Sequence, residues 1–410
     1  MMRMAFLSVH SSPVGKAGSK DTGGMSTYLL GISGALGEIG HEIDIFTRAA
    51  GPDEAEIKRL SPGVRLVTVD DGAGPLSKNE LYPHLPAMVD AIEKFCRIEN
   101  NSYNLIFSHY WLSGCAGREL SKSWQVPHLV MFHTLGRAKN EACREESEPD
   151  LRLAEEEKLA RSSDQIIVAA RLEKERLVNY YSLRKDNVKV ITCGVDRQLF
   201  RPLSRPAAKE ETALKGNKVI LAIGRIEPVK GYELLISAAA LLPAEDKVKV
   251  VIVGGDVKSE IQVAHLKELA ADLGISNRII FSGLVEHQKL PLYYNAADVT
   301  VIPSYYESFG LVALESISCG TTLVAGSTGI FPELLKPYNK KPAELLNKKK
   351  SPGILIENRN PSAWAEAIRN CYLHGSAPLD PSITNDILAP YNWRTAAFSF
   401  SSLIQQLHAK

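Results

Sequence analysis

The stretch KVILAIGRIEPVKGYELLISAAALLPAEDKVKVVIV, residues 218–253, has the pattern of a strand–helix–strand unit. Apolar runs at 218–223 and 247–253 predict two strands, and the apolar spacing of 231–242 predicts a helix between them. The alternation continues with strands expected at 278–282, 299–303 and 322–325 and helices at 260–273, at 288–296 and from about 309. Strands that alternate with helices and are apolar enough for burial on both faces form parallel sheets. The predicted fold class is therefore α/β, with a doubly wound parallel sheet.

The first half of the chain repeats this alternation. It predicts strands at 4–9, 42–47, 64–69, 105–108, 128–132, 165–169 and 188–192, with helices at 26–39, 85–98, 114–121 and 150–161. The pattern lapses at 201–216, the best candidate for a linker. A length of 410 residues also suggests more than one domain. We expect two Rossmann-like domains that face a cleft, at 1–205 and 206–390, with a helix at 391–410 that returns to the first.

Composition narrows the class of protein. Hydrophobic residues make up 45% and charged residues 23%, which excludes a wholly disordered or collagen-like chain. A net charge of +1 favours neither nucleic acid nor an anionic membrane as a partner. The six cysteines have no metal-ligand spacing, and no run approaches the roughly 20 apolar residues of a membrane-spanning helix. We expect a cytoplasmic protein that acts on small molecules, and a homodimer is left open.

Two signatures in the second half carry candidate chemistry. The turn GRIEPVKG at 224–231 places Arg225 and Lys230 just before the start of a predicted helix, where two cations suit a diphosphate. The alternative is a surface turn with two solvated cations. In PSYYESFGLVALE at 303–315, Glu307 and Glu315 are eight residues apart. Burying Glu315 in its apolar helix is costly without partners, so we expect it to face a cleft and accept hydrogen bonds from hydroxyls. The alternative is a Glu315 that points to solvent.

The loop after the first strand is a candidate anion site. Gly23 and Gly24 open a helix, where exposed N–H groups favour an anion. The alternative is an ordinary turn that uses glycine for a positive φ. The loop lacks the G-x-G-x-x-G spacing, which disfavours a nicotinamide-dependent enzyme.

The R-x4-K-G turn followed by E-x7-E resembles the retaining family 4 glycosyltransferases of the GT-B fold, over nearly the whole chain. The stretches HSSP at 10–13, DTGGM at 21–25, SHYWLSG at 108–114 and HTL at 133–135 most resemble the D-inositol-3-phosphate glycosyltransferase and sucrose-phosphate synthase branch. Enzymes of that branch pass a sugar from a nucleoside diphosphate to a phosphorylated acceptor. The resemblance implies retaining transfer from a UDP-sugar to a phosphorylated polyol or sugar, with the inositol-phosphate type preferred.

The resemblance also implies roles for individual residues. The catalytic group would be His133, Arg225, Lys230 and Glu307. The donor would be held by Gly24, Arg225, Lys230, Leu284, Val285, Glu307, Phe309, Gly310, Leu311 and Glu315. The acceptor would be held by His10, Thr22, Gly23, Gly24, Met25, Lys78, Tyr110, Thr134 and Arg152.

One departure from the family pattern concerns the donor sugar. The family places paired glycines before a Pro-Glu in the donor-sugar loop, whereas GSTGIFPE at 326–333 has a single glycine beside Ile330, so the donor sugar is not assigned. The chain has no D-x-D motif, so we expect no metal site or cofactor, and Mg²⁺ would not be essential. Transfer to fructose 6-phosphate, a UDP-sugar epimerase of the same fold, and a non-enzymatic sugar-binding protein remain alternatives.

Overall fold

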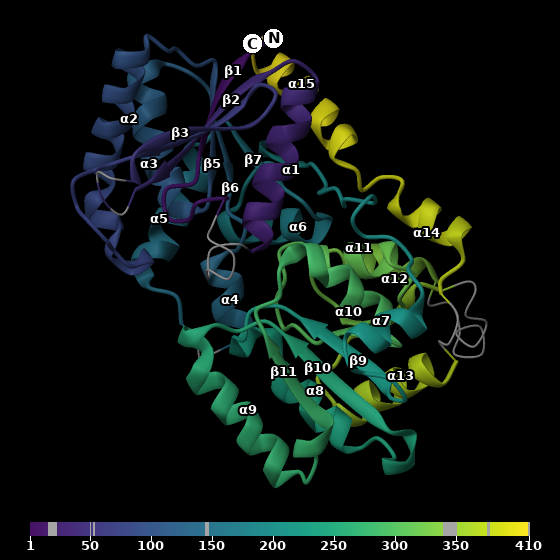
Figure 1. Cartoon of the computed structure of the whole chain (residues 1–410). Coiled ribbons are helices and arrows are strands. Elements are labelled where there is room, and N and C mark those ends of the chain that lie inside the picture. Colours follow the sequence, from purple (N-terminus) through teal and green to yellow (C-terminus); the bar gives the residue numbers. More distant parts are fainter. Residues whose placement is uncertain are drawn as a thin grey trace. The chain divides into compact units, whose positions relative to one another are not determined.

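The computed structural model describes residues 1–14, 23–49, 51, 54–143, 147–338, 351–374 and 378–408. The chain forms two compact units (Figure 1). Unit 1 comprises Met1–Ala138, Glu148–Gly194 and Asn392–Lys410, and unit 2 comprises Lys139–Ser147 and Val195–Tyr391. The main boundary therefore follows Gly194, before the expected position at 205, and a short segment of the first half belongs to unit 2.

Unit 1 is built on an eight-stranded sheet in the order β3-β4-β2-β1-β5-β6-β7-β8. The strands are β1 (Arg3–Leu7), β2 (Glu42–Arg48), β3 (Glu56–Ser61), β4 (Val64–Val69), β5 (Leu105–His109), β6 (His128–Met131), β7 (Gln165–Val168) and β8 (Val188–Val190). All neighbours are parallel except β3 and β4, which form an antiparallel pair at one edge. The sequence did not predict β3, because this largely exposed strand, EIKRLS, lacks the apolar run of a buried strand.

Seven helices are described in unit 1 or at its boundary: α1 (Gly24–Glu38), α2 (Leu85–Glu99), α3 (Trp111–Trp124), α4 (Gly136–Ala142), α5 (Asp150–Ser162), α6 (Arg171–Tyr181) and α15 (Trp393–His408). Helix α15, yellow in Figure 1, lies along α1. A Cβ at Gly31 of α1 would lie 2.3 Å from the Trp393 ring, so the glycine allows the two helices to meet.

Unit 2 contains a six-stranded sheet in the order β11-β10-β9-β12-β13-β14. Its strands are β9 (Lys218–Ile223), β10 (Val248–Val253), β11 (Ile279–Gly283), β12 (Val299–Ile302), β13 (Leu323–Gly326) and β14 (Gly353–Ile356). Every neighbouring pair is parallel. Numbered within the unit, the order is 3-2-1-4-5-6, that of Rossmann folds, which bind ligands beyond the carboxyl ends of the strands.

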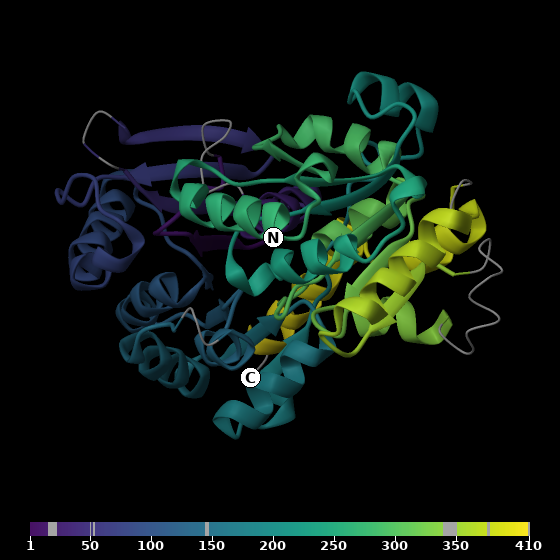
Figure 2. The same cartoon turned by 90° about the horizontal axis from the view of Figure 1, so that it is seen from below.

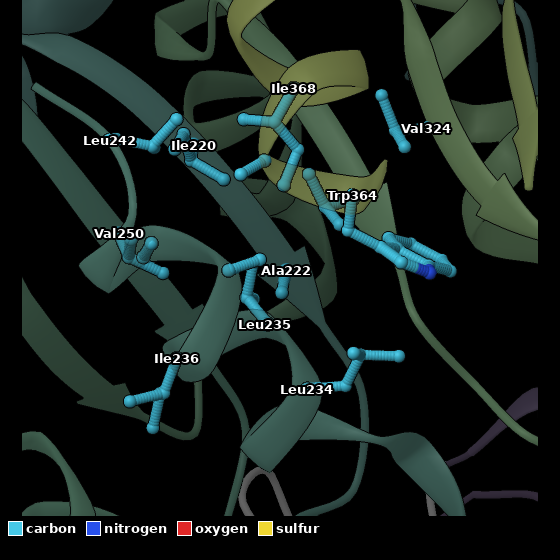
Figure 3. Close-up of a cluster of buried hydrophobic side chains, with 14 of the residues drawn as sticks. Ile220, Ala222, Leu234, Leu235, Ile236, Leu242, Val250, Val324, Trp364 and Ile368 are labelled. Atoms are coloured by element: carbon cyan, nitrogen blue, oxygen red, sulfur yellow. The ribbon is translucent and has the colours of Figure 1, made fainter. Parts of the chain in front are cut away.

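The helices of unit 2 are α7 (Arg205–Glu211), α8 (Tyr232–Ala240), α9 (Glu260–Asp272), α10 (Leu290–Ala296), α11 (Leu311–Ser318), α12 (Phe331–Leu335), α13 (Pro361–His374) and α14 (Pro381–Leu388). They can be followed in Figures 1 and 2. On one face of the sheet, α8, α9 and α13 share a core with β9 and β10, in which Trp364 is 2% exposed (Figure 3).

The predicted linker at 201–216 is wrong in part, because it contains α7. Pro206 lies in the first turn of α7, where a helix does not need its N–H, and Lys209 forms a 2.7 Å ion pair with Asp298. Within the described ranges, no helix combines the length and the hydropathy that a membrane crossing requires.

Candidate active site

The turn at 224–231 follows β9 in unit 2 and packs against the start of the second signature. Gly231 has a φ of +69°, and a Cβ there would lie 2.3 Å from the carbonyl oxygen of Pro303. The N–H of Tyr305 donates to the carbonyl of Val229 over 2.8 Å. The glycine is therefore required both by its left-handed backbone and by this close approach, and the two signatures form one surface of the unit.

The two cations of the turn differ in their surroundings. Lys230 is largely buried and forms a 2.6 Å ion pair with Glu307, whereas Arg225 is 53% exposed and pairs with Glu227 at 2.7 Å. Glu307 also accepts a 2.8 Å hydrogen bond from the Ser304 hydroxyl. The alternative of two solvated cations is therefore wrong for Lys230. A diphosphate at this turn would share Lys230 with Glu307 or displace that carboxylate.

The backbone at 309–311 leads into α11 beside Glu307. Gly310 has a φ of +106°, and a Cβ there would lie 2.4 Å from the Phe331 ring. The carbonyl of Phe309 accepts a 2.8 Å hydrogen bond from the N–H of Ile330. The loop is thus locked to the segment that begins α12, and Leu311 starts a helix whose first N–H groups have no partner within the helix.

Glu315 is buried, so the solvent-facing alternative is wrong. Its carboxylate accepts a 2.6 Å hydrogen bond from the Tyr294 hydroxyl, and its other oxygen lies 3.8 Å from Nε2 of His287. The nearby carboxylate of Glu315 raises the pKa of His287. Leu284 and Val285 follow β11, and Leu284 is half exposed.

Five of the predicted acceptor residues lie together in unit 1 around the ring of Tyr110. The centroid of the His10 ring is 4.4 Å away, the guanidinium carbon of Arg152 is 4.8 Å away and Nζ of Lys78 is 5.4 Å away. Arg152 also donates a 3.0 Å hydrogen bond to the Thr134 hydroxyl. The structure therefore brings together residues from five separate segments of the chain.

The two cations of this cluster, Arg152 and Lys78, differ in how nearby carboxylates balance their charges. Arg152 is 2% exposed and forms ion pairs with Glu148 at 2.8 Å and with Glu156 at 2.7 Å, so its charge is balanced by the protein. Lys78 is exposed and has no carboxylate within ion-pair distance among the described residues. Burial and the charge of Lys78 lower the pKa of His10 to about 3, so that ring is neutral near pH 7. Within the described part of the chain, Lys78 is thus the cation of the cluster whose charge no carboxylate balances.

Two residues near this cluster adopt left-handed backbone conformations. Tyr110 has a φ of +76° and His133 a φ of +59°, which are strained values for residues other than glycine. The Tyr110 hydroxyl is buried and has no hydrogen-bond partner in the described part of the chain. Strain and an unpartnered polar group are both frequent at functional sites, and neither can be read from the sequence.

His133 follows β6 and is paired with a second histidine. Its Nε2 lies 2.9 Å from Nδ1 of His109, at the end of β5. Burial lowers the pKa of His133 to about 3, and the pKa of His109 is also well below its usual value, so both rings are neutral near pH 7. The contact between the two histidines could not be predicted from their spacing in the sequence.

The glycine loop begins α1. Gly23 has a φ of −116°, so the alternative that it serves a positive φ is wrong. A Cβ at Gly23 would meet no atom of the described residues within 4 Å. Gly24 and Met25 form the first turn of α1, and Thr22 lies outside the described residues. No group of three metal-ligating side chains is found in the ranges that the structure describes.

Comparison with known proteins identifies the family. The family "Glycosyltransferase Family 4" matches residues 22–199, and "Glycosyl transferases group 1" matches residues 204–378. The chain is 35% identical over 380 residues to a D-inositol 3-phosphate glycosyltransferase of Xylanimonas cellulosilytica, covering 89% of this chain and 87% of that protein. It is 34% identical over 408 residues to one of Mycobacteroides abscessus, covering 98% and 88%.

Solved structures show the same architecture. Sucrose-phosphate synthase of Thermosynechococcus elongatus has a TM-score of 0.86 and 27% identity, with full coverage of both chains. Anabaena HepE, solved in complex with UDP-glucose, has a TM-score of 0.75 and 19% identity, covering 99% of this chain and all of that one, and it shares the fold. These similarities confirm the GT-B fold, and the chain belongs to the family 4 glycosyltransferases.

Proposed function

We propose that this glycosyltransferase moves a hexosyl or N-acetylhexosaminyl group from a UDP-sugar to a phosphorylated polyol or sugar, with inositol phosphate preferred. The observation that carries the proposal is the cluster around Tyr110. Among the residues that the structure describes, this cluster has a lysine with no carboxylate partner, a hydroxyl with no hydrogen-bond partner and an arginine held in place, which together suit a phosphate group. The names of the similar D-inositol 3-phosphate glycosyltransferases support the same acceptor.

All of the proposed donor residues except Gly24 lie in unit 2. Arg225 and Lys230 would stabilise the charge that develops on the departing diphosphate, and the reaction would need neither a metal ion nor another cofactor. Glu315 would accept hydrogen bonds from the ribose, Leu284 and Val285 would contact uracil, and the backbone at 309–311 would hold the sugar. Gly24 would approach the donor, and Gly23, Met25 and Thr22 would approach the acceptor.

The proposed chemistry is a front-face displacement. The bond from the anomeric carbon to the diphosphate oxygen breaks, and a bond to the acceptor oxygen forms on the same face, which retains the configuration. The acceptor hydroxyl gives its proton to the departing phosphate oxygen. His133 and Glu307 would position the sugar, and a neutral His133 can donate or accept a hydrogen bond there. We propose that the enzyme acts in the cytoplasm, where its six buried cysteine thiols would stay reduced.

Fructose 6-phosphate is a second candidate acceptor. Its support is the similarity to a sucrose-phosphate synthase over the full length of both chains. Both acceptors carry a phosphate, so the cluster around Tyr110 suits either of them.

A matrix of donors and acceptors tests the proposal. UDP-glucose and UDP-N-acetylglucosamine are each combined with D-inositol 3-phosphate, fructose 6-phosphate and unphosphorylated inositol, and UDP release and product mass are measured. We expect turnover with a phosphorylated acceptor and a product of unchanged anomeric configuration by NMR. Interconversion of UDP-sugars without an acceptor would identify an epimerase, and donor binding without turnover would identify a binding protein. Full activity in a variant with both Arg225→Ala and Lys230→Ala would refute the proposed role of these cations.

A further inference from the structure

The histidine pair at the ends of β5 and β6 has a property that the proposed reaction does not use. Nδ1 of His109 and Nε2 of His133 are 2.9 Å apart, so one ring donates and the other accepts. His109 is completely buried, and its own Nε2 has no hydrogen-bond partner within the described ranges. A buried N–H without a partner is rarer than a buried acceptor without one. The favoured arrangement therefore places the proton of His109 on Nδ1, where it forms the hydrogen bond with Nε2 of His133.

We propose that His109 is a positioning residue that donates from Nδ1 to Nε2 of His133 and so holds His133 with its own proton on Nδ1. The inference rests on the proposed function of His133. With Nε2 occupied as an acceptor, His133 offers a ligand an N–H at Nδ1. The second nitrogen of a histidine commonly fixes in this way which nitrogen serves the substrate.

The surroundings of His109 are built to hold its ring in place. Phe107 lies 4.3 Å from it and Phe6 lies 5.6 Å from it, measured between ring centroids. Tyr28 of α1 contacts both imidazoles, with centroid distances of 5.9 Å to His109 and 5.5 Å to His133. A ring packed on several sides keeps the direction of its hydrogen bond, even though His133 has a strained backbone.

Neutral rings are a condition for this arrangement. Burial keeps the pKa values of both histidines well below neutrality, so at pH 7 the pair shares one hydrogen bond and carries no charge. His133 then acts as a hydrogen-bond donor of fixed direction and not as a cation.

The first test reads the tautomer directly and needs no turnover. Ring ¹⁵N spectra of the full-length, ligand-free protein with labelled histidine, assigned with a His133→Asn variant, show which nitrogen carries the proton. We expect His133 to be protonated on Nδ1. Protonation on Nε2 would overturn the proposal, whatever the enzyme turns out to transfer.

The second test uses two substitutions at the same position. His109→Phe keeps a ring but removes the hydrogen bond, whereas His109→Asn keeps an amide N–H near the position of Nδ1. With UDP-N-acetylglucosamine and D-inositol 3-phosphate, or whichever pair the matrix finds active, we expect the phenylalanine variant to lose about tenfold in kcat. The asparagine variant should recover most of that loss and restore the wild-type tautomer of His133.

A matched control is available on the neighbouring strand. His128 is also buried and is hydrogen-bonded at 2.8 Å to Ser108, so His128→Asn removes an imidazole of similar burial. Its kcat should stay near the wild-type value even if its thermal stability falls. Equal losses in the asparagine and phenylalanine variants at 109, or no loss in either, would contradict the proposal. Wild-type protein that turns over no substrate would refute the proposed function, while the tautomer would still decide the role of His109.

Discussion

Replacing Lys78 by methionine should weaken binding of a phosphorylated acceptor and leave an unphosphorylated one unaffected. The reason lies in the different surroundings of the two cations near Tyr110. Arg152 is already balanced by Glu148 and Glu156, whereas Lys78 is exposed and has no carboxylate partner among the described residues. The substitution keeps the length and most of the apolar stem of the side chain while it removes the charge.

The size of the effect follows from the exposure of Lys78. Two unit charges 4 Å apart attract by about 1 kcal/mol in water and about 4 kcal/mol at an effective dielectric constant of 20. For an exposed lysine we take a value near the lower limit, about 1.4 kcal/mol, which corresponds to a tenfold change in affinity. Added salt should reduce the difference, because the Debye length falls to about 3 Å at 1 M ionic strength.

The assay is steady-state kinetics at two ionic strengths. KM for D-inositol 3-phosphate should rise about tenfold in Lys78→Met at low salt, with kcat changed less than about twofold. Lys94→Met, an exposed lysine on α2 of the same unit, is the control and should behave as wild type. An equal change in kcat/KM for inositol and inositol phosphate, or a change no larger than in the control, would refute the role of Lys78 in phosphate binding.

Three further predictions concern stability. Arg152→Met should lower the free energy of unfolding by about 3–5 kcal/mol, because it leaves the fully buried Glu156 without its cation. The control Arg161→Met, at an exposed arginine, should lower it by under about 1 kcal/mol. Equal urea midpoints for the two variants would contradict this prediction. Gly231→Ala should cost about 1–3 kcal/mol and raise KM for the UDP-sugar, since the strained backbone carries Lys230; Gly34→Ala, where a Cβ has space, should be harmless in the same assays. The pKa values of His10, His128 and His133 are lowered to about 3 by burial, so the unfolded chain takes up protons below about pH 6.5 that the folded chain does not. The urea midpoint should therefore fall as the pH drops from 7 to 5, and a constant midpoint would contradict the buried neutral state.

The errors in the predicted fold have physical causes. Most of the parallel strands were predictable because they are continuous apolar runs, but the short parallel strand β14 was not predicted. Strand β3 is largely exposed and polar, and it forms through pairing with β4 rather than through an apolar pattern of its own. Helix α7 looked like a linker because it is short, charged and contains a proline, and its ion pair with Asp298 joins residues far apart in the chain.

The residues of the candidate site were likewise predictable in part, whereas their contacts were not. The resemblance to family 4 glycosyltransferases predicts Lys78, Tyr110, Thr134 and Arg152 as acceptor residues, and the fold brings them together. Spacing could not show that Arg152 is balanced by Glu156 or that Glu315 accepts a hydrogen bond from Tyr294. The geometry of a side chain's contacts, and the burial that sets its pKa, depend on how the elements pack.

The sequence by itself determined the fold class, the family and the turn that carries two cations, because periodicity and motif spacing are properties of a linear chain. Only the tertiary structure decided which charged side chains form ion pairs with one another. Residues 230 and 307 are 77 positions apart, yet Lys230 and Glu307 form a 2.6 Å pair. For the same reason Lys78 has no carboxylate partner in the ranges that the structure describes, while Arg152 has two: the sequence supplies the charges, and folding sets the distances between them.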